Sequence, residues 1–200
     1  GGAIKIFLWD PDTFKYGNLV TRRPPTDDPY QNFGWAHKIV EPGVGSTRST
    51  PAKYMFVSAP GLTADKGRVY MYEWGIGADG STYDSWTQCL SIDSPAGGSS
   101  QRFGHRIQAS DDGNILAVSS VAPGNAGKVE IFVRSSQSND DSVQHSFTHV
   151  QTLTGVSTDG SSLNTKFGDA LTMSKDGGTL VVGAPGHDDS SQADGGAIYI

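Results

Sequence analysis

The sequence predicts an all-β chain built from a repeated antiparallel unit, and two observations lead to this prediction. Short apolar runs alternate with turns rich in Gly, Asp and Ser along the 200 residues. The pattern of one unit, residues 167–200, also recurs, because a Phe-Gly pair begins at Phe33, Phe103 and Phe167, with spacings of 70 and 64 residues. Self-similarity at a fixed period is the sequence signature of a repeat architecture.

Each unit is expected to contain at least three strands. In the last unit, Asp176-Gly177 separates two apolar runs and predicts a hairpin of type I′, in which both central residues take positive φ. The run that closes this unit, Gly-Gly-Ala-Ile-Tyr-Ile at 195–200, nearly repeats the opening Gly-Gly-Ala-Ile-Lys-Ile at 1–6. Similar closing motifs start at Gly67 and Gly127.

These motifs resemble the FG-GAP repeat, the unit of integrin-α-like β-propellers. Phe-Gly stands in all three units, Gly183-Ala-Pro185 is intact, and Ser58-Ala-Pro60 is nearly so. The middle unit departs from the pattern with Ser119-Ser-Val121. The resemblance covers essentially the whole chain and implies a β-propeller segment of four-stranded antiparallel blades, with the ring incomplete.

The chain divides into four segments under this interpretation. The second strands, at 115–118 and 180–183, are apolar on both faces, as strands sandwiched between two other blades must be. Propellers close with about four to eight blades, so we expect the rest of the ring to come from a longer chain or from neighbouring subunits. The expected segments are a blade part at 1–30, blades at 31–100 and 101–165, and a partial blade at 166–200.

Composition excludes several classes of function. The net charge is −6 and no basic cluster exceeds Arg22-Arg23, which argues against binding nucleic acid. Cys89 is the only cysteine, so an intrachain disulfide is impossible. No apolar run approaches the roughly 20 residues of a membrane span. A Gly-, Ser- and Thr-rich repeat without disulfides or glycosylation sequons is typical of an extracellular, cell-surface or virion protein.

Candidate metal ligands are few. Some FG-GAP repeats bind Ca²⁺ in the loop that corresponds to 110–113 and 174–177, but these loops offer only Asp111 and Asp112, or Asp176 alone. Since Ca²⁺ takes six to eight oxygens, we expect turns here rather than ion sites. The loop 186–194 is an alternative cation site through Asp188, Asp189 and Asp194. The histidines and Cys89 lack zinc-site spacing; the histidines are His37, His105, His145, His149 and His187.

Catalytic signatures are also missing from the sequence. There is no Gly-x-Ser-x-Gly elbow, and the paired acids Asp140-Asp141 lie in a polar stretch. Trp35, His105 and Asp169 align directly after Phe-Gly, yet they are not a consistent set of residue types. Five strand aromatics suggest either a sugar-stacking platform or, as we expect, packing between blades; they are Trp35, Tyr70, Tyr72, Trp74 and Trp86.

The sequence therefore predicts a non-catalytic adhesion or assembly module, part of a larger surface or virion and fibre structural protein. Its partner would be a protein or a glycan that contacts the blade loops. We assign no catalytic, cofactor-binding or metal-binding residue. The alternatives are a propeller enzyme acting on carbohydrate, as a glycoside hydrolase or lyase, and a Ca²⁺-dependent recognition module.

Overall fold

The fold is seen in a computed structural model that describes residues 2–25, 28–29, 31–41, 53–74, 86–97, 100–135, 145–155, 164–188 and 195–200. The predictions made for Asp140, Asp141, Asp189 and Asp194 fall outside the described residues.

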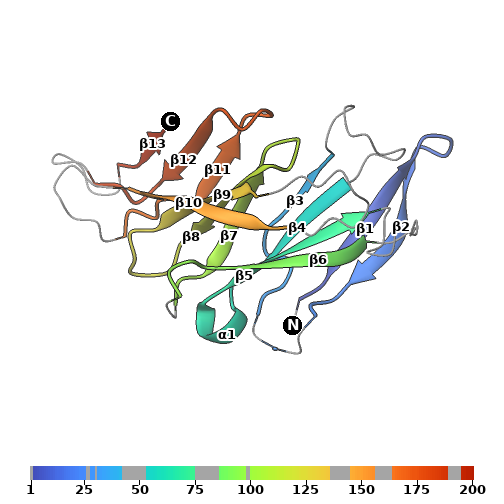
Figure 1. Ribbon diagram of the computed structural model, residues 1–200, viewed down its shortest axis with the longest axis horizontal. Coiled ribbons are helices and arrows are strands. Elements are labelled where there is room, and N and C mark those ends of the chain that lie inside the picture. Colours follow the sequence, from blue (N-terminus) through green and yellow to red (C-terminus); the bar gives the residue numbers. More distant parts are fainter. Residues whose placement is uncertain are drawn as a thin grey trace.

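Four antiparallel sheets stand side by side, which confirms the predicted all-β segment of blades (Figure 1). Within each sheet the strands follow one another in chain order, so every sheet is a meander. The single helix among the described residues, α1 (Leu62–Asp65), has four residues. Blade A contains β1 (Ile4–Asp10) and β2 (Lys15–Arg22), and blade B contains β3 (His37–Val40), β4 (Lys53–Ala59), β5 (Arg68–Trp74) and β6 (Trp86–Asp93). Blade C contains β7 (Phe103–Ala109), β8 (Ile115–Ser120), β9 (Lys128–Arg134) and β10 (Phe147–Thr154), and blade D contains β11 (Ala170–Met173), β12 (Leu180–Ala184) and β13 (Ala197–Tyr199).

The first strands lie innermost and the fourth strands lie outermost. Strand β7 contacts both β3 and β11, whereas β6 and β10 carry few buried residues. Because the strands alternate in direction, every first strand begins at the same end of the sheets. We call this end the loop face, since α1 and the loops between second and third strands lie there. The opposite end, with the 110–115 and 174–179 turns, is the hairpin face.

The hydrophobic core is divided among the three joints between neighbouring blades. Each joint has its own cluster, so the middle strands are covered on both faces, as their continuous apolar sequence predicts. Leu116, Ala117 and Val118 are consecutive and all fully buried. Stability therefore depends on contacts between neighbours, as in other repeat proteins.

The Phe-Gly motif forms the inner part of each joint. Phe33, Phe103 and Phe167 are all buried. A Cβ atom on Gly2, Gly67 or Gly127, at the start of the preceding blade's third strand, would overlap the carbonyl oxygen of the respective Phe. The joint therefore requires Gly in the closing motif of one blade, and the opening motif of the next blade contributes a buried Phe side chain.

The hairpin turns differ from the prediction of type I′. Asp112 and Asp176 do not have positive φ; only Gly113 and Gly177 do, at 70° and 74°. The Gly113 N–H donates to the Ser110 carbonyl at 2.9 Å, so the β-turn comprises residues 110–113 and ends on Gly. The type I′ prediction is wrong because the preceding Ser joins the turn and lengthens it by residues that the Asp-Gly pair alone does not reveal.

Candidate binding face

The acidic residues of the hairpin face hold their own turns. Asp112 Oδ1 accepts hydrogen bonds from Ser110 Oγ at 2.5 Å and from the Asn114 N–H at 3.0 Å, while Asp112 Oδ2 accepts one from Asn114 Nδ2. Burial opposes ionisation of Asp112, but these bonds outweigh it and lower the pKa of the carboxyl. Asp176 makes the same bonds to Ser174 and Gly178, which lower its pKa. The recurring Ser-x-Asp-Gly sequence is thus a turn with a defined structural role.

Most of the strand aromatics pack between blades, as expected. Tyr70, Tyr72 and Trp86 are buried, and Trp74 lies against Trp86 with ring centroids 5.6 Å apart. Burial raises the pKa of Tyr72 to about 12. Trp35 is the exception, because 54% of its surface is exposed.

A buried cluster that the sequence did not suggest lies at the joint between blades B and C. His145, just before β10, has Nε2 2.9 Å from Oε2 of Glu73 on β5. The sulfur of Cys89, on the adjacent strand β6, lies close to both residues. The three possible ligand atoms lie within 4.8 Å of one another. Nitrogen, sulfur and oxygen donors are the set that zinc takes in proteins. The residues come from two blades at irregular spacing, so no sequence motif connects them.

The hydrogen bonds of this cluster do not fit a metal. Arg134 contacts His145 Nδ1, and because a guanidinium only donates, Nδ1 accepts and Nε2 carries the proton given to Glu73. A zinc-binding His instead coordinates the metal through one unprotonated nitrogen and donates the other N–H to an acceptor. In His145 the unprotonated nitrogen, Nδ1, is already occupied by Arg134. Burial raises the pKa of the Cys89 thiol to about 12, although the residue as a whole is exposed. The cluster is a hydrogen-bonded chain that links blades B and C.

Three residues that align in sequence meet on the loop face. Trp35, His105 and Asp169 each follow a Phe-Gly pair. Trp35 lies two residues before β3, His105 lies in β7, and Asp169 lies directly before β11, so the three stand beside the first strands of blades B, C and D. The ring centroids of Trp35 and His105 are 5.9 Å apart. His105 Nε2 lies 2.8 Å from Asp169 Oδ1 and donates to it, since a carboxylate only accepts. These residues align in the sequence without forming a consistent set of residue types, and the fold makes them neighbours.

Arg106 extends this group, which we name the first-strand row: Trp35, His105, Arg106 and Asp169. Its Nη2 lies 3.9 Å from Asp169 Oδ1, and its Nη1 donates to the His105 carbonyl at 3.0 Å. Arg106 and Asp169 are each about two-fifths exposed. Asp169 also borders an open hollow of about 670 Å³ on the face of blade D that points away from blade C, lined in part by Gly183, Gly196 and Ile198.

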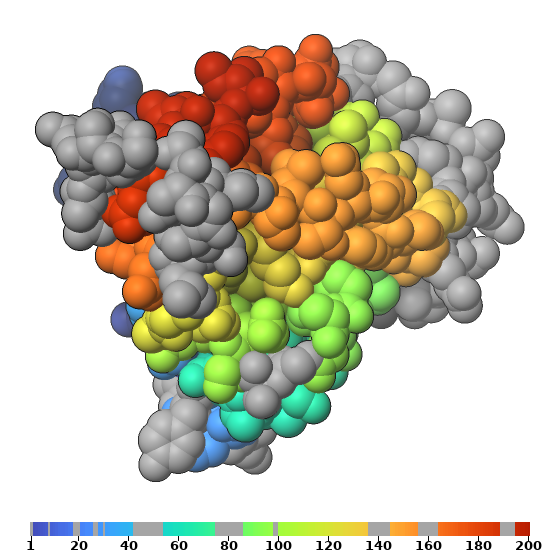
Figure 2. Space-filling model, turned by 90° about the vertical axis from the view of Figure 1, so that its left-hand side faces the viewer, coloured from blue at the N-terminus to red at the C-terminus, as the bar shows by residue number. Residues whose placement is uncertain are grey.

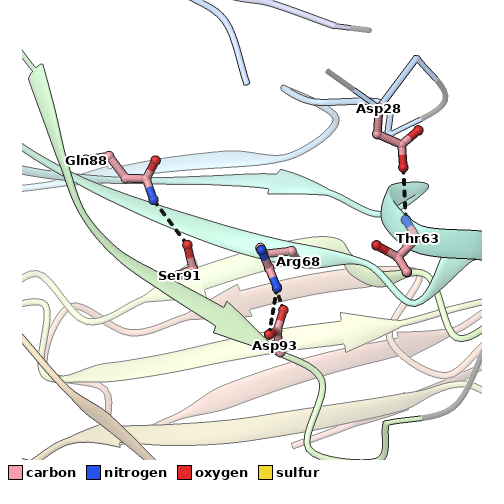
Figure 3. Close-up of polar contacts among 6 residues, drawn as sticks. All are labelled: Asp28, Thr63, Arg68, Gln88, Ser91 and Asp93. Carbon is pink, nitrogen blue, oxygen red and sulfur yellow. Dashed lines mark hydrogen bonds and ion pairs between the residues drawn. The ribbon is translucent and has the colours of Figure 1, made fainter. Parts of the chain in front are cut away.

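A second hollow on the loop face, of about 270 Å³, lies beside α1 and is lined in part by Lys66, Arg68 and Ser94. Figure 3 shows the polar contacts made by residues of this region. Thr63, Ala64 and Asp65 all have positive φ there, and the Thr63 N–H donates to Asp28 Oδ2. Arg68 is held by Asp93 through bonds of 2.5 and 2.8 Å, and Gln88 by Ser91 at 3.1 Å. The cation of Arg68 is therefore already neutralised by Asp93.

The two end blades leave repeat positions exposed that are buried elsewhere. Ile198 and Ile200 of blade D occupy the places of Val129 and Ile131 in blade C and are 73% and 92% exposed. The space-filling view shows this end of the molecule, with the last residues in dark red at the surface (Figure 2). On blade A, Phe7, Trp9 and Tyr16 are at least half exposed, whereas their counterparts in blade B, Tyr72 and Trp86 among them, pack against a neighbour.

One family comparison covers part of the chain. Residues 147–200, which hold the outer strand of blade C and all of blade D, match the sequence model of the FG-GAP repeat. Among curated proteins no sequence matches the chain. None of the helices in the described residues is long and apolar enough to cross a membrane.

Proposed function

We propose that the chain is a non-catalytic binding and assembly module, because residues 147–200 match the FG-GAP repeat and the same kind of joint recurs between the described blades. In this role it packs against further blades at both ends and presents its loop face to a protein or glycan partner. A place in a surface, virion or fibre structural protein fits this role.

The observation that carries the proposal is the open end of blade D. Gly67 and Gly127 each lie against the backbone of a Phe from the next blade, whereas among the described residues no atom comes closer than 3.6 Å to a Cβ placed on the equivalent Gly196. The hollow beside Gly196 has the lining that a blade opening with Phe-Gly needs: small residues and an exposed Ile.

The chemistry of the two ends supports the same role. At the joint between blades A and B, aliphatic side chains of one blade, such as Ile4 and Ile6, meet aromatic side chains of the next, such as Tyr70 and Tyr72. Blade D offers an aliphatic surface and blade A offers an aromatic one. Since a monomer rarely exposes such surfaces without use, both ends are suited to further blades.

A fusion in repeat register tests this assembly role. Residue 200 corresponds to residue 71, so a second copy of residues 72–155 placed after Ile200 would supply a fourth strand and a complete next blade. We expect the backbone amides of 197–200 to become protected from hydrogen exchange, because the new Phe-Gly closes the joint at Gly196. The control fusion carries Phe103→Ala in the added copy only. Unchanged exchange at 197–200 in the first fusion would contradict the proposal.

A further inference from the structure

We propose that the first-strand row binds a neutral sugar ring of a glycan, stacked on Trp35 and hydrogen-bonded by Asp169 and Arg106. The inference rests on the proposed function as a binding module and names the class of partner for the loop face.

Trp35 supplies the apolar surface of this site. The indole is more than half exposed, although its ring already contacts His105 on one side. The other strand aromatics named as a possible sugar platform are buried or packed between blades, so they are not available to a ligand. A large flat ring in the bend that leads into a first strand offers a stacking surface to a ligand.

Asp169 and Arg106 supply the polar contacts. Asp169 uses Oδ1 for His105 and Arg106, and no bond to its Oδ2 is seen among the described residues. A sugar hydroxyl both donates and accepts, so vicinal hydroxyls match a free carboxylate oxygen beside the N–H groups of a guanidinium. His105 fixes the orientation of Asp169 and separates it from the indole.

The charges of the row decide between a neutral and a charged ligand. One carboxylate and one guanidinium lie within 3.9 Å of each other, so the row carries no net charge apart from His105. A site for an anion or a cation would present an excess of the opposite charge. Few polar groups converging beside an aromatic ring favour a neutral polyhydroxyl ligand instead.

Packing between blades explains only part of the row. The His105–Asp169 bond joins blades C and D and would stabilise the fold without any ligand. That role does not require an exposed indole at Trp35 or a guanidinium at Arg106. The equivalent positions next to Trp35 and Asp169 are Ala36 and Ala170, which shows that the fold accepts a small side chain where Arg106 stands.

The test follows the Trp35 indole N–H by NMR while neutral oligosaccharides are added to the whole chain. The probes are cellohexaose, maltohexaose, xylohexaose and chitohexaose, and Trp35→Phe assigns the signal. We expect one of them to shift the Trp35 resonance at millimolar concentration. Trp35→Ala and Asp169→Asn should each weaken binding by about tenfold or more, which corresponds to roughly 1.4 kcal/mol per tenfold. Trp9→Ala, at an exposed Trp of blade A, is the control and should leave binding unchanged.

Three results would overturn the inference. They are the absence of any Trp35 shift with all four probes, an equal loss of binding in Trp9→Ala, and tighter binding of a sialylated or sulfated glycan than of its neutral form. Thermal melts of each variant separate unfolding from a local loss of contact. Asp169 borders the hollow that the added blade would fill, so sugar binding is measured on the unfused chain. Loss of sugar binding there leaves the assembly role standing, because the exchange of residues 197–200 is a separate readout, and failure of the fusion does not decide sugar binding.

Discussion

The joint between blades C and D and the open side of blade D are built from the same repeat position but differ in environment. Val129 is fully buried against blade D, whereas Ile198, its equivalent one blade later, is largely exposed. Gly127 lies against the backbone of Phe167, whereas no described residue approaches Gly196 as closely. The motif therefore specifies a surface, and the presence of a neighbour decides whether that surface becomes core.

Removing the Phe of a closed joint should have the largest effect. We expect Phe167→Ala to lower the free energy of unfolding by roughly 3–5 kcal/mol, from lost burial and the cavity that remains. Urea denaturation measures this. Phe14→Ala is the matched control, since Phe14 is 77% exposed and its loss should cost much less. Equal effects of the two variants would contradict the assignment of Phe167 to the joint.

The equivalent isoleucines Ile4 and Ile198 compare a closed and an open surface directly. Ile4→Ala should destabilise the chain by about 2–5 kcal/mol, because Ile4 is buried against blade B. Ile198→Ala should change stability by no more than about 0.5 kcal/mol. Thermal melts of both variants provide the measurement, and a large loss for Ile198→Ala would mean that the open side is already covered.

The closing glycines separate backbone strain from steric overlap. Gly127 and Gly196 both have positive φ, at 82° and 71°, so alanine at either site adds about 1–2 kcal/mol of strain. Gly127→Ala also forces a Cβ against the Phe167 carbonyl, which should add roughly 1–3 kcal/mol. Chemical denaturation of the pair measures the difference, and identical losses would refute the close approach.

Glu130 distinguishes blade C from its neighbours, because blades B and D have Tyr70 and Tyr199 at the same repeat position. Only blade C should therefore owe part of its stability to a carboxylate at this position, and that part should depend on pH. Burial opposes its ionisation, but bonds from Lys128, Thr152 and His149 outweigh this and lower the pKa of the carboxyl. Because the pKa of Glu130 is lower in the folded than in the unfolded chain, its carboxylate stabilises the fold fully above the ordinary Glu pKa. This stabilisation is lost as pH falls through the folded pKa.

Glu130→Gln should therefore cost about 1 kcal/mol at neutral pH and less in acid. Melting temperatures between pH 7 and pH 3 measure the effect, with the exposed Asp12→Asn as control. Parallel pH curves for the wild type and Glu130→Gln would show that Glu130 contributes no charge-dependent stability.

The sequence predicts most of the fold because each strand repeats a pattern. Apolar runs on both faces of 115–118 and 180–183 indicate sandwiched strands, and the Phe-Gly spacing indicates the blade period. The turn type was missed because the Ser110 hydroxyl takes part in the turn, and a two-residue motif does not include it.

The candidate sites were harder to predict because they form between blades. Glu73, Cys89 and His145 have no shared spacing, so only packing brings them together. Trp35, His105 and Asp169 were aligned from sequence and then set aside because their side chains differ. The proposed sugar site combines stacking with hydrogen bonding and would need different residue types, which a search for one repeated residue type does not detect.

The irregular register of the outer strands has a consequence for engineering. In blades A, B and C the pairing of third and fourth strands skips one residue at the same level, at 19, 89 and 150. Such an extra residue increases local twist and bends the strand. It lies on the outermost strand of each blade, which forms the rim of the segment. Because Val150 is more than half exposed there, the rim of blade C is the place to graft an epitope or a dye with the least disturbance to the joints.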